Sequence, residues 1–347
     1  MPSYAKFLQL GLALDPIHVG TGGARIGRVD LTIVRDPVTQ VPKIPGSSLA
    51  GVYRTYVAMH QQEANPNRQV NGQPKPYYPD CAGLGLDPNH RHCRQRDCPV
   101  CTVFGFATGA GQSGGFAGLA SFSDAHVLLF PVPTRQGPMW ISCPMALRLV
   151  GLEVSGVDND AVYLENTANT ANPLNLGWLL LPVQQCNQMS QIQTQLQTLN
   201  VPDYIRSRLA LVPDRLFAHI VNTNLEVRTS VSINPTTGAA EEGALFSYEA
   251  LPRSTVLVWE IIAKNPAYFR IGNQPLTAVS DPDSVHDVTR QAHPYLEHLG
   301  IGGMGTRGMG RLRVLYASQP PSNQSVQCDA SPSAPAPSST SQGGGQP

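Results

Sequence analysis

The sequence is poor in charge and almost without lysine. Only 14% of its 347 residues are charged, and its 24 basic side chains comprise 20 Arg and 4 Lys. Acidic and basic residues balance to a formal net charge of zero, which excludes a protein that coats nucleic acid through overall basicity. Because arginine makes planar, hydrogen-bonded and stacked contacts, we expect any RNA or DNA site to be local and shaped.

Long apolar runs are also missing. No stretch approaches the roughly 20 apolar residues that cross a bilayer. The apolar start of the chain is short, is ended by Asp15 and lacks the small-residue cleavage site of a signal peptide. Its leucines and Phe7 predict instead a half-buried first strand over residues 7–14. We therefore expect a cytoplasmic protein that has no membrane partner.

Glycine and proline are abundant, with 32 and 31 residues, and predict a globular chain with long loops. The length allows one large domain or two ordinary ones. Polar, proline-rich sequence after residue 62 indicates an insertion over residues 63–117. From residue 317 to 347, a Ser/Pro/Gln/Gly-rich tail has too little apolar surface to order itself, and we expect it to be disordered.

Local patterns predict both helices and strands. Ser47 or Ser48 is a suitable N-cap for a helix that ends near residue 59. Period-two alternation over residues 226–233, a turn, and strand-like sequence over residues 243–248 predict a long hairpin or arm. Further elements are expected as a strand at 118–127, a strand near 146–154, helices over 187–217 and 285–298, and a buried strand at 256–262. Together they fit an α+β sandwich of the ferredoxin-like kind.

Four of the seven cysteines fall within 21 residues of the insertion, spaced Cys-x11-Cys-x4-Cys-x2-Cys. They are Cys81, Cys93, Cys98 and Cys101. Four thiolates at this spacing suit a tetrahedral, structural Zn²⁺ site, in which His90 or His92 could replace one cysteine. The alternative is free thiols or a disulfide pair, which a reducing compartment disfavours.

The other cysteines carry no such pattern. Cys143 and Cys186 stand alone in apolar surroundings and are interpreted as packed core residues. Cys328 lies in the tail and is expected to be inert.

Residues 299–311 contain six glycines and two arginines. Glycine lets backbone amides turn towards a phosphate, and Arg307 and Arg311 supply matching charge. The letters Gly300-x-Gly302-x-x-Gly305 match the dinucleotide fingerprint, but that motif follows a strand and opens a helix, the reverse of the order expected here. We therefore favour a nucleic-acid site over a nicotinamide site, with a plain surface turn as the alternative.

Two aspartates near the N-terminus have different interpretations. Asp36 begins Asp-Pro-Val-Thr, which is typical of a type I turn. Asp30 follows a Gly/Arg-rich loop over residues 22–28 and has no turn partner. Its carboxylate could hold a divalent cation or orient a ribose hydroxyl, although the residues alone favour a solvated loop aspartate. His18, at a strand end, is on the same grounds a structural histidine.

Five segments in this order resemble the RAMP superfamily, specifically the repeated backbone subunit of type III CRISPR effector complexes. They are HVGTG, GRVDLTIVRDPVTQVPKIPGSSLAGVYR, LASFSDAHV, EVRTSVSINPTTGAAEEGALFSYEALP and LGIGGMGTRGMGRLRV. The stretch around EEGALFSYEALPRSTVL is most similar to the Cmr-type (III-B) subunit, and RDPVTQVPKIPGSSL is shared with the Csm-type (III-A) subunit. The similarity covers about residues 5–60, 118–127 and 205–315.

The resemblance implies a modified ferredoxin-like (RRM-like) palm, built from residues 1–62 and 118–316. It would bind CRISPR guide RNA and pack with copies of itself, beside other type III effector subunits, in a helical backbone. A thumb at about residues 222–248 would displace bases at regular intervals between guide and target RNA. Asp30 is implied to cut the target RNA with Mg²⁺ or Mn²⁺, and His18 and Glu249 are implied as further contributors.

The resemblance also implies a set of RNA-binding residues. They are Gly22, Arg25, Arg28, Lys43, Ser47, Ser48, Arg54, Gly303, Gly305, Arg307, Gly308 and Arg311. The family lysine of PGSSLKG is replaced here by Ala50, which leaves Arg54, one turn on, or Lys43 to take its phosphate contact. Two alternatives remain open: a scaffold subunit that does not cleave, and an enzyme that processes guide RNA with His18 as base.

Overall fold

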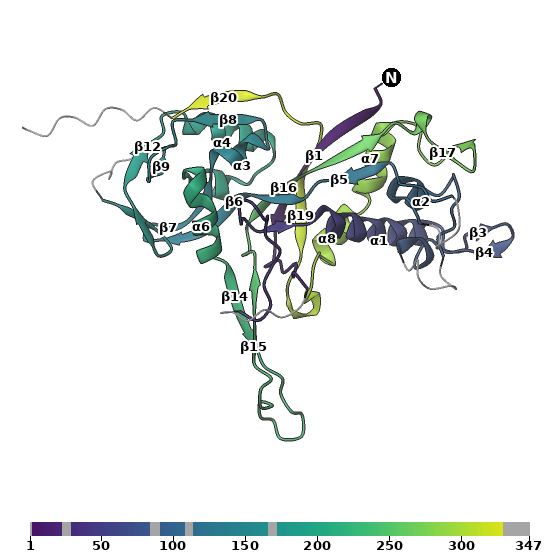
Figure 1. Ribbon diagram of the computed structural model, residues 1–347, viewed down its shortest axis with the longest axis horizontal. Coiled ribbons are helices and arrows are strands. Elements are labelled where there is room, and N and C mark those ends of the chain that lie inside the picture. Colours follow the sequence, from purple (N-terminus) through teal and green to yellow (C-terminus); the bar gives the residue numbers. More distant parts are fainter. Residues whose placement is uncertain (1, 23–28, 84–90, 108–113, 166–171, 329–347) are drawn as a thin grey trace, which may run out of the picture.

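The computed structural model describes residues 2–22, 29–83, 91–107, 114–165 and 172–328. It is a mixed α/β structure built around one large sheet, whose longest path runs β12-β9-β13-β7-β6-β16-β1-β19 (Figure 1). The strands of this path are β1 (Tyr4–Ala13), β6 (Ala125–Thr134), β7 (Gly137–Ser142), β9 (Val162–Leu164), β12 (Val183–Gln185), β13 (Leu209–Leu211), β16 (Val256–Lys264) and β19 (Leu312–Ser318). Strand β2 (Lys43–Ile44) pairs with β6, and β5 (Ala120–Phe122) pairs with β16.

Strand β1 is buried on both faces, so the expectation of a half-buried strand was wrong. It lies between β16 and β19 and is antiparallel to both. Phe7 belongs to one apolar cluster, whereas Leu8, Leu10 and Leu12 belong to another on the opposite face. Layers of helices cover both faces, and a strand covered on both sides carries a continuous apolar run in place of alternation.

The first layer contains α1 (Gly46–Ala64), α2 (Pro99–Phe104), α6 (Asp214–Thr223), α7 (Pro282–Arg290) and α8 (His293–His298). The second contains α4 (Met189–Thr198) and α5 (Asp203–Arg206), whereas α3 (Pro144–Arg148) contributes Ala146 to the first apolar cluster and Leu147 to the second. Small paired strands are β3 (Gln69–Val70) with β4 (Gln73–Pro74), β10 (Leu174–Leu176) with β11 (Leu179–Leu181), and β17 (Arg270–Ile271) with β18 (Gln274–Pro275). Single 3₁₀ turns are Asp80–Ala82, Pro266–Tyr268 and Gly305–Arg307.

Helix α1 begins two or three residues earlier than expected and extends to Ala64, and neither Ser47 nor Ser48 caps it. The N-cap is Pro45, whose side chain has no acceptor. The amide of Gly46 donates instead to the carboxylate of Asp124, 2.8 Å away. A carboxylate at a helix N-terminus satisfies an otherwise unpaired amide and interacts favourably with the helix dipole. The cap therefore comes from a residue 78 positions along the chain.

Prolines divide two segments that were expected to be single helices. In residues 187–217 the structure has α4, α5 and α6, with Pro202 and Pro213 as N-caps and β13 between the last two. Residues 285–298 form α7 and α8, and Pro294 lies in the first turn of α8. Because proline lacks an amide hydrogen and clashes with the preceding turn, it begins helices more readily than it continues them. The expected strand near 146–154 is α3 followed by β8 (Leu152–Ser155).

The predicted hairpin is present and projects away from the body of the molecule (Figure 1). It is formed by β14 (Glu226–Ser230) and β15 (Phe246–Ala250), which pair antiparallel from Glu226 opposite Ala250 to Ser230 opposite Phe246. We call residues 226–250 the arm. Among the described residues, none of the helices combines the length and apolarity that a bilayer crossing requires.

The tail is ordered further than expected. Strand β20 (Gln324–Gln327) pairs in parallel with β8, and Cys328 forms a disulfide with Cys186. Val326 and Cys328 are each 1% exposed and belong to the second apolar cluster. Cys186 is a packed core residue, as interpreted, but it is not isolated, and the expectation that Cys328 is inert was wrong. Residues 329–347 lie outside the described residues.

We expect Cys328→Ser to lower the free energy of unfolding by about 2–4 kcal/mol, because the disulfide closes a long loop in the unfolded chain. The bond joins residues 142 positions apart. Urea denaturation of the variant and of the wild type, with and without reductant, measures this loss. Reductant should reproduce it in the wild type and leave the variant unchanged. Non-reducing peptide mapping that finds Cys186 and Cys328 unlinked would contradict the assignment.

Candidate functional site

Segments from the two ends of the chain meet on β15. Leu31 forms a parallel β-bridge with Tyr248, and its amide donates a hydrogen bond to the carbonyl oxygen of Ser247 at 3.1 Å. The amide of Glu249 in turn donates to the carbonyl oxygen of Leu31, at 3.0 Å. Val34 donates to the carbonyl oxygen of Val19, so the segment after His18 is bound to the same edge. This ladder extends the base of the arm and places Asp30 beside β15.

A small apolar cluster attaches residues 299–311, which we call the glycine-rich loop, to the arm. Its buried members are Tyr248, Ala250 and Met309, and Leu31, Phe246 and Met304 pack against them. The guanidinium of Arg307 lies 5.5 Å from the centre of the Phe246 ring, within the range of a cation–π contact. The loop predicted to bind phosphate and the carboxylate of Asp30 therefore flank the same strand.

The carboxylate of Asp30 is exposed and held by one residue. Its Oδ2 accepts hydrogen bonds from the amide of Ser247 at 2.7 Å and from the Ser247 hydroxyl at 2.9 Å. The backbone bond, followed by the side-chain bond, lowers the pKa of Asp30 below its ordinary value. At neutral pH the group is thus a carboxylate anion. It is suited to binding a cation or a hydroxyl group and is a weak proton acceptor.

The other two residues expected in cleavage lie on the same ladder. His18 is 6% exposed, and its Nδ1 lies 2.6 Å from the carbonyl oxygen of Glu249. A carbonyl can only accept, so Nδ1 carries the proton. The Glu249 carboxylate accepts from the Arg35 guanidinium at 2.9 Å and from the Ile33 amide at 3.3 Å. This carboxylate therefore fixes the ladder, and a direct role for His18 or Glu249 in cleavage stays a prediction.

The glycines of the loop fall into two groups. At Gly300, Gly302 and Gly310 φ is positive, and a Cβ atom would come within 2.6 Å of backbone atoms of neighbouring segments. These three glycines are required by packing inside the protein, so not all six serve phosphate binding. The predicted RNA contacts Gly303, Gly305 and Gly308 are exposed, as is Arg307. The amide of Gly303 already donates to the carbonyl oxygen of His18 at 2.9 Å.

Two predicted phosphate ligands are paired inside the chain. Lys43 lies 2.6 Å from a carboxylate oxygen of Asp124 and 3.4 Å from one of Asp36. Arg311 donates two hydrogen bonds to Asp15. Within the described part of the chain, no carboxylate pairs with Arg307. Of the remaining predicted contacts, Ser47 and Gly22 are exposed and Ser48 is half-buried, while Arg25 and Arg28 lie outside the described residues.

Arg54 lies against the cysteine-rich insertion. Its Nε donates to the carbonyl oxygen of Cys81 at 2.9 Å, and another guanidinium nitrogen donates to that of Gly105 at 2.6 Å. The same nitrogen lies 3.2 Å from Nδ1 of His92. The side chain points towards the cysteine-rich insertion, where two of its three nitrogens make these contacts, and its phosphate contact stays a prediction. The expectation that Asp36 forms a turn is confirmed: its carboxylate accepts hydrogen bonds from the amides of Val38 and Thr39, and its carbonyl oxygen accepts from the amide of Gln40 at 2.9 Å, so the turn spans five residues and is not the expected type I turn.

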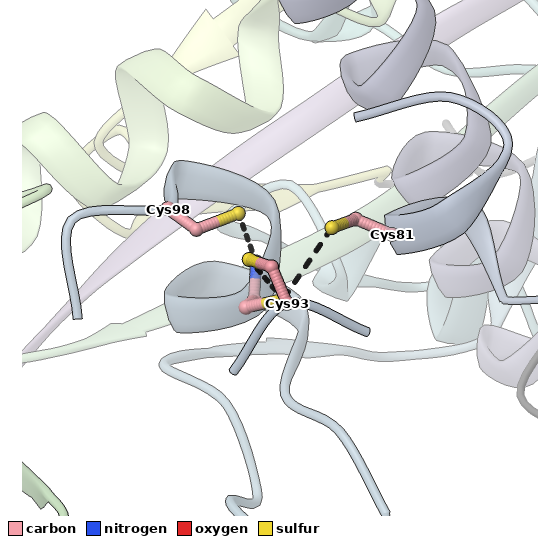
Figure 2. A group of neighbouring side chains, drawn as sticks. Cys81, Cys93 and Cys98 are labelled. Atoms are coloured by element: carbon pink, nitrogen blue, oxygen red, sulfur yellow. Dashed lines mark hydrogen bonds between the residues drawn. The ribbon is translucent and has the colours of Figure 1, made fainter. Parts of the chain in front are cut away.

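The four insertion cysteines converge on one point. The sulfur atoms of Cys81, Cys93, Cys98 and Cys101 all lie within 4.8 Å of one another. Figure 2 shows the side chains of Cys81, Cys93 and Cys98 directed towards each other. The Cys93–Cys101 and Cys101–Cys81 sulfur distances are 3.6 and 3.8 Å. Zn–S bonds of about 2.3 Å give a tetrahedron with edges of about 3.8 Å, so this group could hold a metal ion.

Neighbouring groups fit anionic sulfur ligands. The amide of Cys101 donates to Sγ of Cys98 at 3.4 Å, and the Arg68 guanidinium to Sγ of Cys93 at 3.1 Å. Such donors stabilise the thiolate form that binds metals. With four sulfurs together, neither histidine is needed as a ligand. His92 lies beside Arg54, and His90 lies outside the described residues.

Comparison with known proteins agrees with this arrangement. The family model for the RAMP superfamily matches residues 12–313. The chain belongs to the RAMP superfamily. It is 26% identical over 327 residues to the CRISPR system Cmr endoribonuclease Cmr4 of Pyrococcus furiosus, which covers 89% of this chain and 95% of that protein. It is 33% identical over 108 residues to the Cms endoribonuclease Csm3 of Methanothermobacter thermautotrophicus, over 31% of this chain and 32% of that protein.

Solved structures of Cmr proteins share the fold. A chain of the type III-B Cmr-beta complex bound to cognate target RNA superposes with a TM-score of 0.58 and 14% identity, covering 91% of this chain and 98% of that chain. Oligomeric Cmr4 from Pyrococcus furiosus gives a TM-score of 0.52 and 18% identity, over 89% of this chain and 98% of that one. The shared fold thus extends over about nine tenths of this chain and nearly all of each compared chain.

Two residues of the site around Asp30 were not predicted from the sequence. Ser247 holds Asp30, and Arg35 joins Glu249 to Asn222. Both lie in segments that resemble the family, but a lone serine in a strand and an arginine before a turn carry no local signal. Only the pairing of residues 30–33 with β15 shows what they contact.

Proposed function

We propose that this protein is a repeated backbone subunit of a type III CRISPR effector complex, which binds guide RNA and cleaves complementary target RNA. The observation that carries the proposal is the exposed carboxylate of Asp30. It is fixed to the arm and flanked by the glycine-rich loop over residues 299–311. It is supported by the similarity to Cmr4 over most of both chains. The palm would be of the modified ferredoxin-like kind, and the arm would act as the thumb.

The chemistry needs no nucleophile from the protein. If the arm unstacks a base, the ribose 2′-hydroxyl at that point can turn in line with its own phosphate. Asp30 would orient this hydroxyl, and the Arg307 guanidinium would stabilise the developing negative charge. A divalent cation, Mg²⁺ or Mn²⁺, would add Lewis-acid stabilisation of the phosphate when bound near this carboxylate. Guide–target pairing, and not the protein, would read the sequence.

The cysteine group would hold a structural Zn²⁺. Four sulfur ligands fill a tetrahedral site and leave no position for a reactive water, so the metal would stabilise the insertion and take no part in cleavage. Residues 63–117 would fold around it. The Cys93 and Cys81 thiols lie too deep for substrate, since both are 9% exposed or less.

Assembly with copies of itself and with other effector subunits is supported by exposed apolar side chains on the β10–β11 hairpin. Trp178 is 94% exposed between β10 and β11, and the neighbouring Leu180 is 60% exposed. Tryptophan is enriched at the centres of protein interfaces. We propose that this hairpin contacts an adjacent subunit of the helical backbone.

Purified complex tests the proposed function. We expect guide RNA to co-purify, and a complementary labelled RNA to be cut at evenly spaced positions in the presence of Mg²⁺ or Mn²⁺. The isolated subunit should not process precursor guide RNA. A complex without bound RNA would contradict the proposal, and cutting at a single site in guide RNA would favour a processing enzyme.

A further inference from the structure

We propose that Ser247 is a positioning residue for RNA cleavage, which fixes the carboxylate of Asp30 to the arm. The inference rests on the proposed function, because it assigns a role to a neighbour of the same carboxylate. The contact is reciprocal. The Ser247 amide and hydroxyl donate to Oδ2 of Asp30 at 2.7 and 2.9 Å, and the amide of Asp30 lies 3.3 Å from the Ser247 hydroxyl oxygen.

An exposed aspartate without such contacts samples several rotamers, and each must be restricted before reaction. Here two donors from one residue select a single orientation in advance, which is how a reacting group is held in productive geometry. Among the described residues both hydrogen bonds fall on Oδ2. The second oxygen of Asp30 is therefore the one available to a ribose hydroxyl or a cation.

Ser247 is itself firmly held. It pairs with Thr229 across the hairpin, and its carbonyl oxygen accepts from the amide of Leu31. The adjacent Phe246 and Tyr248 belong to the apolar cluster that also contains Met309 of the glycine-rich loop. The position of the carboxylate is thus set by the arm and by the loop together, although Asp30 lies 217 residues before Ser247.

This arrangement links two events that cleavage requires. The arm would displace a base, and the strand at the base of the same arm carries the donors that aim the carboxylate. When the arm lies between guide and target RNA, it would hold Asp30 at the displaced nucleotide. When the arm lies elsewhere, the Asp30 carboxylate would lie away from that nucleotide. The serine hydroxyl is the part of this link that can be removed without changing the backbone.

The test uses the assembled complex with guide RNA, under single-turnover conditions with labelled target RNA. For Ser247→Ala we expect the cleavage rate constant to fall about 10- to 100-fold while the affinity for target RNA stays within about 2-fold, since only the orientation of a reacting group changes. Ser247→Thr keeps the hydroxyl and should retain the rate within about 3-fold. Ser247→Cys, with a weak donor, should behave like alanine.

Ser230→Ala is the matched control, because this serine lies on the neighbouring strand of the arm and its hydroxyl contacts Tyr248 at 3.4 Å. It should cut at the wild-type rate. The inference is overturned if Ser247→Ala also cuts at that rate, or if both alanine variants lose activity alike, which would indicate general weakening of the arm. If the alanine variant fails to assemble, the comparison of the threonine and cysteine variants decides the question.

Failure of the inference and failure of the proposed function give different results. If cutting depends on Asp30 but not on Ser247, only the positioning role is lost. If the wild-type complex does not cut target RNA, or cuts it equally well without the Asp30 carboxylate, the proposed function is lost as well.

Discussion

Asp30→Asn is expected to reduce target-RNA cleavage by at least about 100-fold while leaving guide binding and assembly intact. The substitution keeps the size of the side chain and an oxygen that can accept from Ser247, but removes the negative charge. Preorganised charge at a reacting centre is commonly worth a factor of about 100 to 1,000 in rate. Because Asp30 is exposed and does not support the core, the fold should be unaffected. Single-turnover cleavage of end-labelled target RNA measures the change.

Asp36→Asn is the matched control for this experiment. Asp36 lies six residues further along the chain, and its carboxylate accepts hydrogen bonds from the turn amides of Val38 and Thr39. Asparagine fills the same turn role, so cleavage should persist. An unchanged ladder of products from Asp30→Asn would remove the nuclease assignment and leave a scaffold that binds guide and target without cutting.

The second large effect concerns the cysteine group. Cys98→Ser is expected to reduce the metal content from about one zinc per chain to near zero and to unfold the insertion, because a structural site of this kind supplies folding free energy. The loss of stability should extend to α1, since Arg54 of that helix donates a hydrogen bond to the carbonyl oxygen of Cys81. Elemental analysis of protein prepared without chelator, together with thermal unfolding, measures both consequences.

Cys143→Ser controls for the removal of a buried thiol. Cys143 is fully buried but lies outside the four-cysteine group. This variant should keep its zinc, whatever it loses in stability. Wild-type protein with far less than one zinc per chain would overturn the metal assignment. Treatment with a strong chelator should mimic Cys98→Ser, with a lowered melting temperature that added Zn²⁺ restores.

Local patterns in the sequence were sufficient for much of the framework. The first strand, the arm and the buried strand at 256–262 follow from alternation and apolar runs, and the order of α8, glycine loop and β19 is as expected. The cysteine spacing predicted a group that the structure brings together. These features depend on residues close together in the chain, where periodicity and spacing carry the information.

What could not be predicted depends on distant partners. Whether Arg54 faces RNA or the cysteines, and whether Lys43 is free or paired with Asp124, is decided by contacts across dozens of residues. The tail looked disordered by composition, yet Val326 and Cys328 are buried against the second apolar cluster. The contact between Asp30 and Ser247 also joins residues that are distant in the sequence. Ser247 could therefore be identified as the residue that orients the carboxylate only from the structure.

The ladder at the base of the arm has a consequence for synthesis of the protein. His18 and Leu31 leave the ribosome early, but their partners on β15 and in residues 299–311 follow more than 200 residues later. We expect the nascent chain to carry this N-terminal stretch unpaired until translation is almost complete. A truncated product that ends before β15 would therefore lack the Ser247 contacts that hold the Asp30 carboxylate.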